Sequence, residues 1–219
     1  MPASTRPGAR PTTEPRPRER APHLGPERRR PQVLDAALTI AVREGIGAVT
    51  IGSVAAEMGV TRPVVYACFS DRVEMVEALL DREVPLLVAG VLDALHSSGG
   101  AADSEQAFVN GFRTLLATVT ASPATWRLVF SGEPDLAVAE RFRTARAHVT
   151  EQTTAWIAPA MELWWQTPEL DRKLPVLIEF FLASCESAVR SVLDESNDWG
   201  PEDLGEFVGR AVHRAFKDA

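Results

Sequence analysis

The sequence predicts an all-α fold, in which a small N-terminal three-helix domain precedes a larger C-terminal helical domain. Few segments alternate apolar and polar residues as a half-buried strand would. Apolar residues instead recur at spacings of three and four, which is the period of a helix. Prolines and glycines stand at the ends of these segments, where helices begin and stop. We expect an arm at 1–26, the small domain at 27–84 and the larger domain at 85–219.

The N-terminal residues 1–26 are rich in proline and arginine and have no apolar periodicity, so we expect an extended arm there. Residues 1–30 hold eight arginines and three glutamates, whereas the net charge of the whole chain is −7. A basic arm therefore precedes an acidic body. Either the arm contacts nucleic acid or it is a solvated tail. Arg28, Arg29 and Arg30 are the stronger candidates for such contacts, because they adjoin the first helix.

The first helix is expected at 31–44, because its apolar residues share one face. Pro31 suits the first helical position, and Gly45 suits the stop.

Two short helices are expected next, at 51–58 and 62–68. Thr50 and Thr61 precede them and are of the residue type that caps a helix N-terminus. Pro63 is tolerated in the first turn of the second helix.

A fourth helix is expected to begin at Asp71, which suits a capping box with Glu74, and to continue past a bend at Pro85 toward His96. The later helices are expected at about 104–121, 123–130, 135–165, 172–195 and 201–216.

Residues 50–69 have the spacing of two short helices that cross at a steep angle through a tight turn. The crossing needs a small side chain, which Ala55 supplies. The turn needs a residue that tolerates positive φ, which Gly59 supplies four residues later. Val65 is expected to pack back against the first of the two helices. The remaining inward positions are Val54, Met58 and Val60. The pattern predicts a helix-turn-helix.

The second short helix is expected to present Thr61, Arg62, Pro63, Val64 and Tyr66 on its outer side. Arg62 can donate two hydrogen bonds to a guanine in the major groove. Pro63 and Val64 offer apolar contact to a thymine methyl, and Tyr66 can donate its hydroxyl to a phosphate. The N-terminus of this helix adds the positive end of the helix dipole. This surface predicts recognition of double-stranded DNA.

Residues 28–80 closely resemble the DNA-binding domain of the tetracycline-repressor (TetR) family. The matching residues are LDAAL at 34–38, EG at 44–45, Thr50, VA at 54–55, GV at 59–60, Tyr66 and Phe69. The resemblance implies that Phe69 belongs to the helix-turn-helix scaffold and that Arg72 contacts a phosphate. Cys68 departs from the family, which often has histidine there, and this change removes one phosphate contact.

The same resemblance implies that the region after about residue 85 binds an effector and dimerises through the last two long helices. The predicted pocket for a small apolar effector is lined by Phe108, Phe112, Trp126, Phe130, Trp156 and Met161. The predicted dimer face consists of Ile178, Phe181, Cys185, Val189, Phe207, Val208 and Ala211, and Gly205 and Gly209 would allow close helix approach. For both sets the alternative is ordinary packing within the chain.

Several classes of function find no support in the sequence. No metal-ligand spacing, nucleophile elbow, Walker loop or dinucleotide fingerprint occurs, so we expect no enzyme, no metal and no cofactor. Two cysteines do not suggest a disulfide framework. The longest uncharged apolar run, at 84–92, is too short to cross a bilayer, and the N-terminus lacks the apolar region of a secretory signal. We therefore expect a cytoplasmic protein without a membrane partner.

The sequence thus predicts a homodimeric repressor whose two recognition helices enter successive major grooves of a pseudo-palindromic operator. A small apolar effector in the C-terminal domain would release it from DNA. The alternative is a DNA-binding regulator without a small ligand, which acts as an activator or is controlled by a protein partner.

Overall fold

The computed structural model describes residues 25–97, 103–130 and 136–219. Within these ranges every regular element is helical, which confirms the all-α prediction. The elements are α1 (Pro26–Glu44), the 3-10 turn η1 (Ile46–Ala48), α2 (Ile51–Glu57), α3 (Arg62–Tyr66), α4 (Arg72–Ser97), α5 (Ser104–Ala121), α6 (Pro123–Phe130), α7 (Leu136–Trp165), α8 (Leu170–Leu193) and α9 (Pro201–Lys217). The predicted arm lies outside the described residues except for its last two positions.

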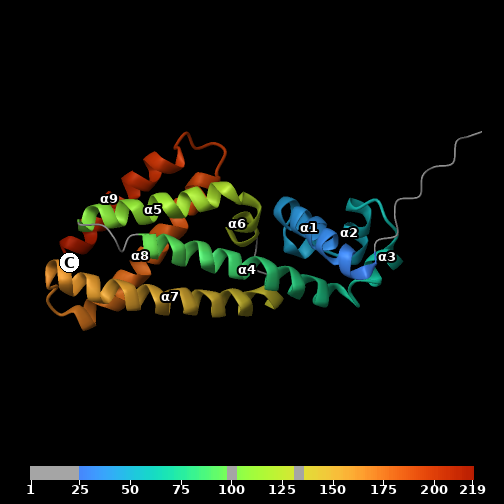
Figure 1. The fold of residues 1–219 in the computed structure, drawn as a ribbon, viewed down its shortest axis with the longest axis horizontal. Helices are drawn as coiled ribbons and strands as arrows, with labels where there is room; N and C mark the ends of the chain where they lie inside the picture. Colours follow the sequence, from blue (N-terminus) through green and yellow to red (C-terminus); the bar gives the residue numbers. More distant parts are fainter. Residues whose placement is uncertain (1–24, 98–102, 131–135) are drawn as a thin grey trace, which may run out of the picture.

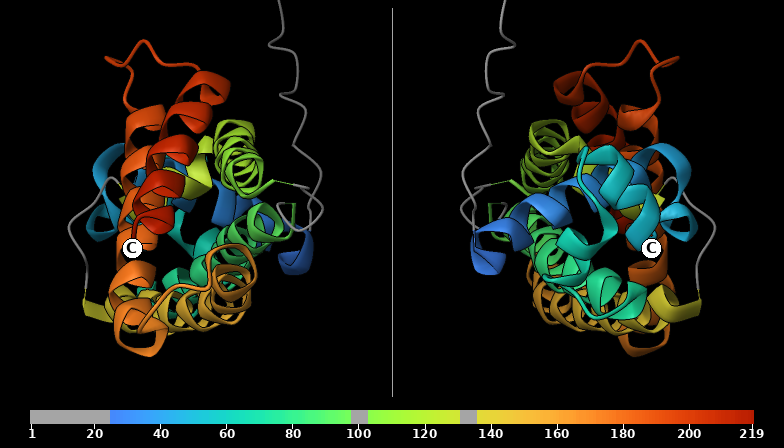
Figure 2. Two further views of the ribbon diagram at one scale, coloured as in Figure 1. Left: turned by 90° about the vertical axis from the view of Figure 1, so that its left-hand side faces the viewer. Right: turned by 90° about the vertical axis from the view of Figure 1, so that its right-hand side faces the viewer.

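The helices form two groups along the long axis of the molecule (Figure 1). Helices α1, α2 and α3 gather at one end with the start of α4, and α5 to α9 occupy the rest. Helix α4 runs from one group into the other beside α7 (Figure 1). Seen along that axis, α7 and α9 lie on opposite sides over most of their length (Figure 2). The predicted boundary at 84/85 falls inside α4, so this helix belongs to both groups.

Helix α1 begins five residues earlier than expected, at Pro26 rather than Pro31. Pro26 takes the first-turn position after Gly25, and Pro31 lies inside the helix. The extra turn is held down by Arg30, whose guanidinium donates to the carbonyl oxygen of Cys68 at 2.6 Å. This tertiary contact stabilises a helical conformation at residues 26–30, whereas the local sequence indicates a start at Pro31.

The small group has its own core of side chains from α1 to α4, among them Ile40, Val54, Phe69 and Leu79. One residue from the other group joins it, since Leu128 of α6 is buried in the same cluster. The two groups are therefore joined by packing as well as by α4.

The larger group is built around α5, whose Phe108 and Phe112 are buried among α8 and α9. Helix α9 approaches α5 closely at two glycines. A Cβ on Gly205 would lie 2.8 Å from the Cα of Arg113, and one on Gly209 would lie 2.7 Å from the Cα of Val109. The close approach predicted for these glycines thus exists, but it joins α9 to α5 of the same chain.

None of the helices in the described ranges is both long enough and apolar enough to cross a lipid bilayer.

A buried histidine at the α5–α9 contact predicts a dependence of stability on pH. His213 is 6% exposed, its Nε2 lies 3.0 Å from the hydroxyl of Ser104, and its Nδ1 has no hydrogen-bond partner. Burial lowers the pKa of His213, although the carboxylate of Glu105, 3.9 Å from Nδ1, opposes that change. The unfolded chain therefore takes up a proton at a higher pH than the folded chain, and protonation favours unfolding.

We expect the free energy of unfolding to fall as the pH drops below about 6.5, the ordinary histidine value. Urea denaturation at about pH 7.5 and about pH 5.5 would measure the change. Acidic groups elsewhere also titrate, so His213→Gln serves as the comparison. An equal loss of stability in the variant would show that His213 is not the group responsible.

Candidate functional site

The helix-turn-helix begins with a well-formed cap on α2. The side chain of Thr50 accepts a hydrogen bond from the backbone N–H of Ser53 at 3.0 Å, and the Ser53 hydroxyl accepts one from the backbone N–H of Thr50 at 2.9 Å. This reciprocal capping box satisfies two backbone donors that the helix leaves unpaired. It fixes where α2 starts and therefore how α3 is presented.

Thr61 stands at the N-cap position of α3, but its side chain makes no capping hydrogen bond, contrary to the prediction. The cause is chemical. An N-cap side chain accepts from the second or third helical N–H. Pro63 occupies the second position and has no N–H, while the N–H of Val64 donates to the carbonyl oxygen of Thr61 at 2.9 Å. The exposed hydroxyl of Thr61 is thereby left for a partner outside the chain.

The turn between α2 and α3 depends on Gly59, whose φ of +64° lies in the left-handed region. The N–H of Val60 closes the turn by donating to the carbonyl oxygen of Ala55 at 2.9 Å. Ala55 and Val65 are buried where the helices cross, at 3% and 0% exposure. The short helix α3 is thus fixed in orientation by a core behind it.

The outer side of α3 is open to solvent. Arg62 and Pro63 are exposed, Val64 is half-buried, and Tyr66 is 54% exposed. Arg62 makes no hydrogen bond or ion pair within the part of the chain that the structure describes. Its guanidinium lies across α2, where a Cβ on Gly52 would be 3.1 Å from Nη2. The surface therefore offers hydrogen-bond donors beside apolar groups, the combination that reads base edges in a major groove.

Two of the arginines predicted to contact DNA make hydrogen bonds within the protein. Arg30 donates to the carbonyl oxygen of Cys68, and its guanidinium carbon lies 4.2 Å from the centroid of the Phe69 ring. Arg72 donates to the carbonyl oxygens of Val49 at 2.8 Å and Ile46 at 3.1 Å. These carbonyls lie in or just after short helical turns, where the arginines add donors from the side chain. Arg30 and Arg72 thus hold the scaffold together.

Their neighbours Arg28 and Arg29 remain at the surface, one exposed and the other half-buried. Contacts of these two residues with phosphate stay a prediction.

A cavity of about 310 Å³ lies between α4, α7 and α8. Its lining residues are Val84, Leu87, Val88, Val91, Leu115, Trp126, Ala145, Arg146, Val149, Leu182, Cys185, Glu186, Val189 and Arg190. A small void of about 20 Å³ adjoins it and shares Val91, Leu115 and Cys185 with it.

The predicted pocket residues divide between these spaces. Trp126 lines the large cavity, whereas Phe108, Phe112 and Trp156 line the small void. Met161 is 1% exposed and lines neither of the two, because it packs in the core. The side chain of Phe130 lies outside the described residues. The valines and leucines of α4, α7 and α8 are half of the lining residues, and sequence reasoning missed them because it looked for aromatic residues.

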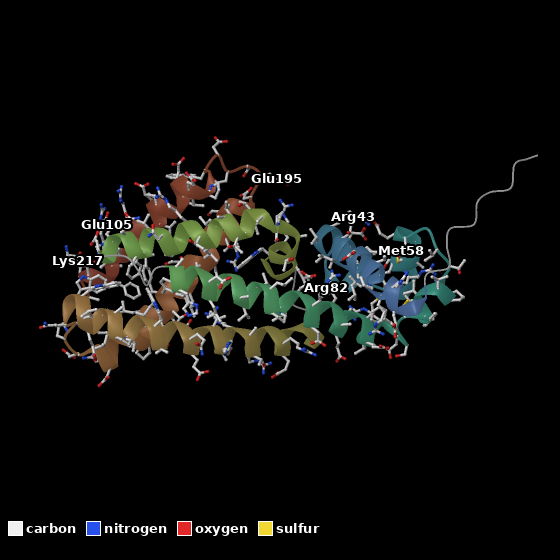
Figure 3. All side chains as sticks on the ribbon, viewed as in Figure 1. Arg43, Met58, Arg82, Glu105, Glu195 and Lys217 are labelled. Carbon is white, nitrogen blue, oxygen red and sulfur yellow. The ribbon has the colours of Figure 1, made fainter. Side chains whose placement is uncertain are left out.

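Three consecutive residues of α4 link it to three different helices. Arg141 of α7 is paired with Asp81, Arg82 with Asp35 of α1 at 2.7 Å, and Glu83 accepts from Thr125 of α6 at 2.6 Å. Arg82 lies where the two groups of helices meet (Figure 3). Glu83 is 3% exposed, so its carboxylate depends on these hydrogen bonds.

The short helix α6 also lines the cavity with Trp126. Its Leu128 is buried in the core formed by α1 to α4. Helix α6 thus contacts the cavity, α4 and α1 at once.

The predicted dimer face requires a correction. Ile178, Phe181 and Val189 are buried in the core of their own chain, and Cys185 lines the cavity. They face inward because α8 packs its broader apolar side against α5. Of the predicted residues, Phe207 and Ala211 are exposed and Val208 is half-buried.

The outer side of α8 instead carries Val176 and Phe180, at 70% and 44% exposure. On the outer side of α9, Phe207 is 59% exposed and its ring centroid lies 5.2 Å from that of Trp199. Exposed apolar groups on two adjacent helices mark a surface suited to association.

Within the smaller group of helices, one stretch of the chain matches a known protein family. The family model described as "Bacterial regulatory proteins, tetR family" matches residues 33–79. The chain is 31% identical over 114 residues to the HTH-type transcriptional activator FasR of Mycolicibacterium smegmatis, and this match covers 52% of the chain and 51% of FasR. It therefore spans about half the length of that relative. It is 28% identical over 171 residues to the HTH-type transcriptional regulator AlkX of Mycobacterium tuberculosis, with 77% and 78% covered.

Solved structures resemble the whole fold. The fatty acid degradation regulator FadR from Bacillus halodurans matches with a TM-score of 0.66 at 12% identity, over 90% of this chain and 97% of that one. The ketosteroid transcriptional regulator KstR2 of Mycobacterium tuberculosis matches with a TM-score of 0.63 at 19% identity, over 85% and 94%. At such identities the likeness concerns the arrangement of the helices.

Proposed function

Since the chain belongs to the TetR family and is a DNA-binding transcriptional regulator, we propose that it is a homodimeric cytoplasmic repressor, released from its operator by a small, largely apolar effector. The observation that carries the proposal is that α6 contacts both the cavity and the core of the helix-turn-helix domain. Its Trp126 lines the cavity, and its Leu128 is buried in the core that holds the helix-turn-helix. A ligand that displaces Trp126 would therefore strain the packing behind α1.

On the DNA side, α3 would enter the major groove with Arg62 leading. Thr61, Pro63, Val64 and Tyr66 surround it, and Arg28 and Arg29 add positive charge to the same domain. Thr50, at the start of α2, is exposed and would lie near the DNA backbone. The anchors Arg30 and Arg72 would act indirectly, by holding α3 against the rest of the domain.

Two such domains must be held at a fixed separation to read a pseudo-palindromic operator. We propose that the outer sides of α8 and α9 pair across a two-fold axis, with Val176, Phe180, Phe207 and Ala211 in the contact. An isologous contact buries the same apolar residues on both chains. A dimer is supported because these side chains are exposed in the single chain.

Coupling would run from the cavity through α6 to α4. A ligand releases DNA only if it binds the non-DNA-binding arrangement more tightly than the DNA-binding one. The hydrogen bond from Thr125 to Glu83 and the pair of Arg82 with Asp35 connect α6 to α4 and α4 to α1. Both contacts would have to adjust when the ligand enters.

A binding measurement with the full chain tests the proposal. Fluorescence anisotropy with duplexes that flank its own gene should show specific binding, and apolar compounds that raise the melting temperature should also dissociate the DNA. Val149→Trp, which fills the cavity wall, should keep DNA binding and lose the response to those compounds. Compounds that stabilise the protein without weakening DNA binding would contradict release by an effector.

A second reading has its own support, because FasR carries the name of an activator. In that case the regulator would raise transcription from DNA-bound sites. A reporter gene placed behind the operator distinguishes the two, since deletion of a repressor raises expression whereas deletion of an activator lowers it.

A further inference from the structure

We propose that the ligand of the cavity between α4, α7 and α8 is an amphipathic monoanion, with an apolar body against the cavity wall and one carboxylate at Arg146. The inference rests on the proposed function only in taking this cavity as the effector site. It adds the chemical class of the effector, which an apolar pocket alone would leave open.

The wall of the cavity is apolar over most of its extent. Three valines and a leucine from α4, Leu115 and Trp126 from α5 and α6, and Val149, Leu182 and Val189 from α7 and α8 line it. Cys185 adds a thiol that stays neutral, because burial raises its pKa. A ligand that fills this space gains free energy in proportion to the apolar area it buries.

The charged lining residues are confined to α7 and α8. They are Arg146, Glu186 and Arg190, so the charge of the lining is +1. Glu186 and Arg190 are one turn apart on α8, and Arg146 reaches the same place from α7. A ligand carrying one negative charge would make this lining neutral. A cationic ligand would instead meet two guanidinium groups with only one carboxylate.

Arg146 is already placed to exchange partners. In the single chain it is paired with Glu186, and its Nη2 lies 2.9 Å from Glu179. Glu179 does not line the cavity, and its side chain is 62% exposed. If a ligand carboxylate takes one edge of the Arg146 guanidinium, Glu179 can turn into water at small cost. A planar guanidinium accepts such an exchange well, because it can hold a carboxylate through two parallel hydrogen bonds.

A neutral ligand has no equivalent position. An apolar molecule that filled the whole cavity would take the Arg146–Glu186 pair out of water without adding a hydrogen bond to it, and removing a charged pair from water is costly. The carboxylate therefore determines both which ligand is accepted and which way round it lies.

Three probes with the same alkyl chain test the proposal on the full-length protein without DNA. These are dodecanoate, dodecanol and dodecyltrimethylammonium, each titrated by calorimetry below its micelle concentration. We expect dodecanoate to bind at least about tenfold more tightly than the other two, the ratio given by one charge-assisted hydrogen bond.

Variants of Arg146 then locate the head group. Arg146→Gln should weaken dodecanoate about tenfold and leave dodecanol unchanged. Arg146→Lys should keep much of the preference. Arg146→Glu should shift the preference toward the ammonium probe. Arg143→Gln is the matched control, because Arg143 lies on the same helix, is 69% exposed and pairs with Glu140 outside the cavity.

The outcomes separate the two proposals. Equal affinity for all three probes, or no effect of Arg146→Gln, would overturn the carboxylate assignment, even if Val149→Trp still blocked binding. If dodecanoate still binds the Val149→Trp variant, it binds outside this cavity and the carboxylate assignment is wrong. The assignment is also wrong if the folded protein binds none of the three probes. DNA release is not measured in this experiment, so a ligand that binds as expected without releasing DNA would count against the proposed function alone.

Discussion

Replacing Gly209 with valine is expected to lower the free energy of unfolding by about 2–3 kcal/mol, the upper part of the range for overpacking a well-packed contact. A Cβ at this position would lie 2.7 Å from the Cα and 2.9 Å from the N of Val109. Both are backbone atoms, so no side chain can rotate away. The α5–α9 contact would have to open along its length, and the ring of Phe108 beside it would lose its packing against Phe216.

The measurement is a thermal or urea melt of the purified variant. For a chain of this size the expected decrease in melting temperature is roughly 5–10 °C. Gly47→Val is the matched control, because a Cβ on Gly47 would meet no atom within 4 Å. Both substitutions add the same side chain, but Gly47 lies in the open 3-10 turn η1 whereas Gly209 faces α5. Equal melting temperatures for the two variants would contradict the close contact between α5 and α9.

The helices themselves could be predicted from the sequence because their boundaries are encoded locally. The helices α5 and α6 begin and end at the expected residues, since Asp103 caps one and Pro123 opens the other. Where a boundary depends on a distant partner, local signals fail. The extra turn of α1 is held by the contact of Arg30 with Cys68, which lie 38 residues apart.

The partner of each helix face could not be predicted in the same way. Helix α8 has an apolar residue on both sides, with Ile178 buried and Val176 exposed. Helical periodicity shows that a face is apolar, but it does not distinguish the interior of one chain from the surface of a second. The two glycines of α9 raised the same ambiguity, and the backbone of α5 resolves it.

Charged residues of the DNA-binding domain show a related limit. Both Arg62 and Arg72 were expected to reach DNA, Arg62 at a base and Arg72 at a phosphate, and both stand at the start of a helix. The structure separates them, because Arg72 donates to the carbonyls of Val49 and Ile46 whereas Arg62 points along the outside of α2. Which guanidinium is engaged within the chain therefore depends on which carbonyls come near it after folding, and a single sequence does not show this.

Replacing Arg62 with alanine is expected to weaken binding to the operator by about 1–3 kcal/mol, or roughly five- to 150-fold, and to relax the preference at one base pair of each half-site. The reason is that an arginine at the first position of α3 can donate two parallel hydrogen bonds to a guanine. Alanine keeps the helix and the exposed Thr61 and Tyr66, so contacts to the phosphates should persist. Competition between the operator and a set of single-base variants measures both effects.

Arg43→Ala is the control for charge alone. Arg43 is exposed on α1 and paired with Glu44 and Glu57, and its loss changes the net charge by the same amount (Figure 3). If Arg62 reads a base, its variant flattens the ranking of the operator variants, whereas the Arg43 variant lowers every affinity slightly and keeps their order. If Arg62 instead contacts a phosphate, the ranking survives and the salt dependence of binding becomes shallower by about one ion. In that case the Arg62 guanidinium, which lies beside Gly52, would be held at the DNA backbone. The remaining exposed residues of α3 would then have to read the bases.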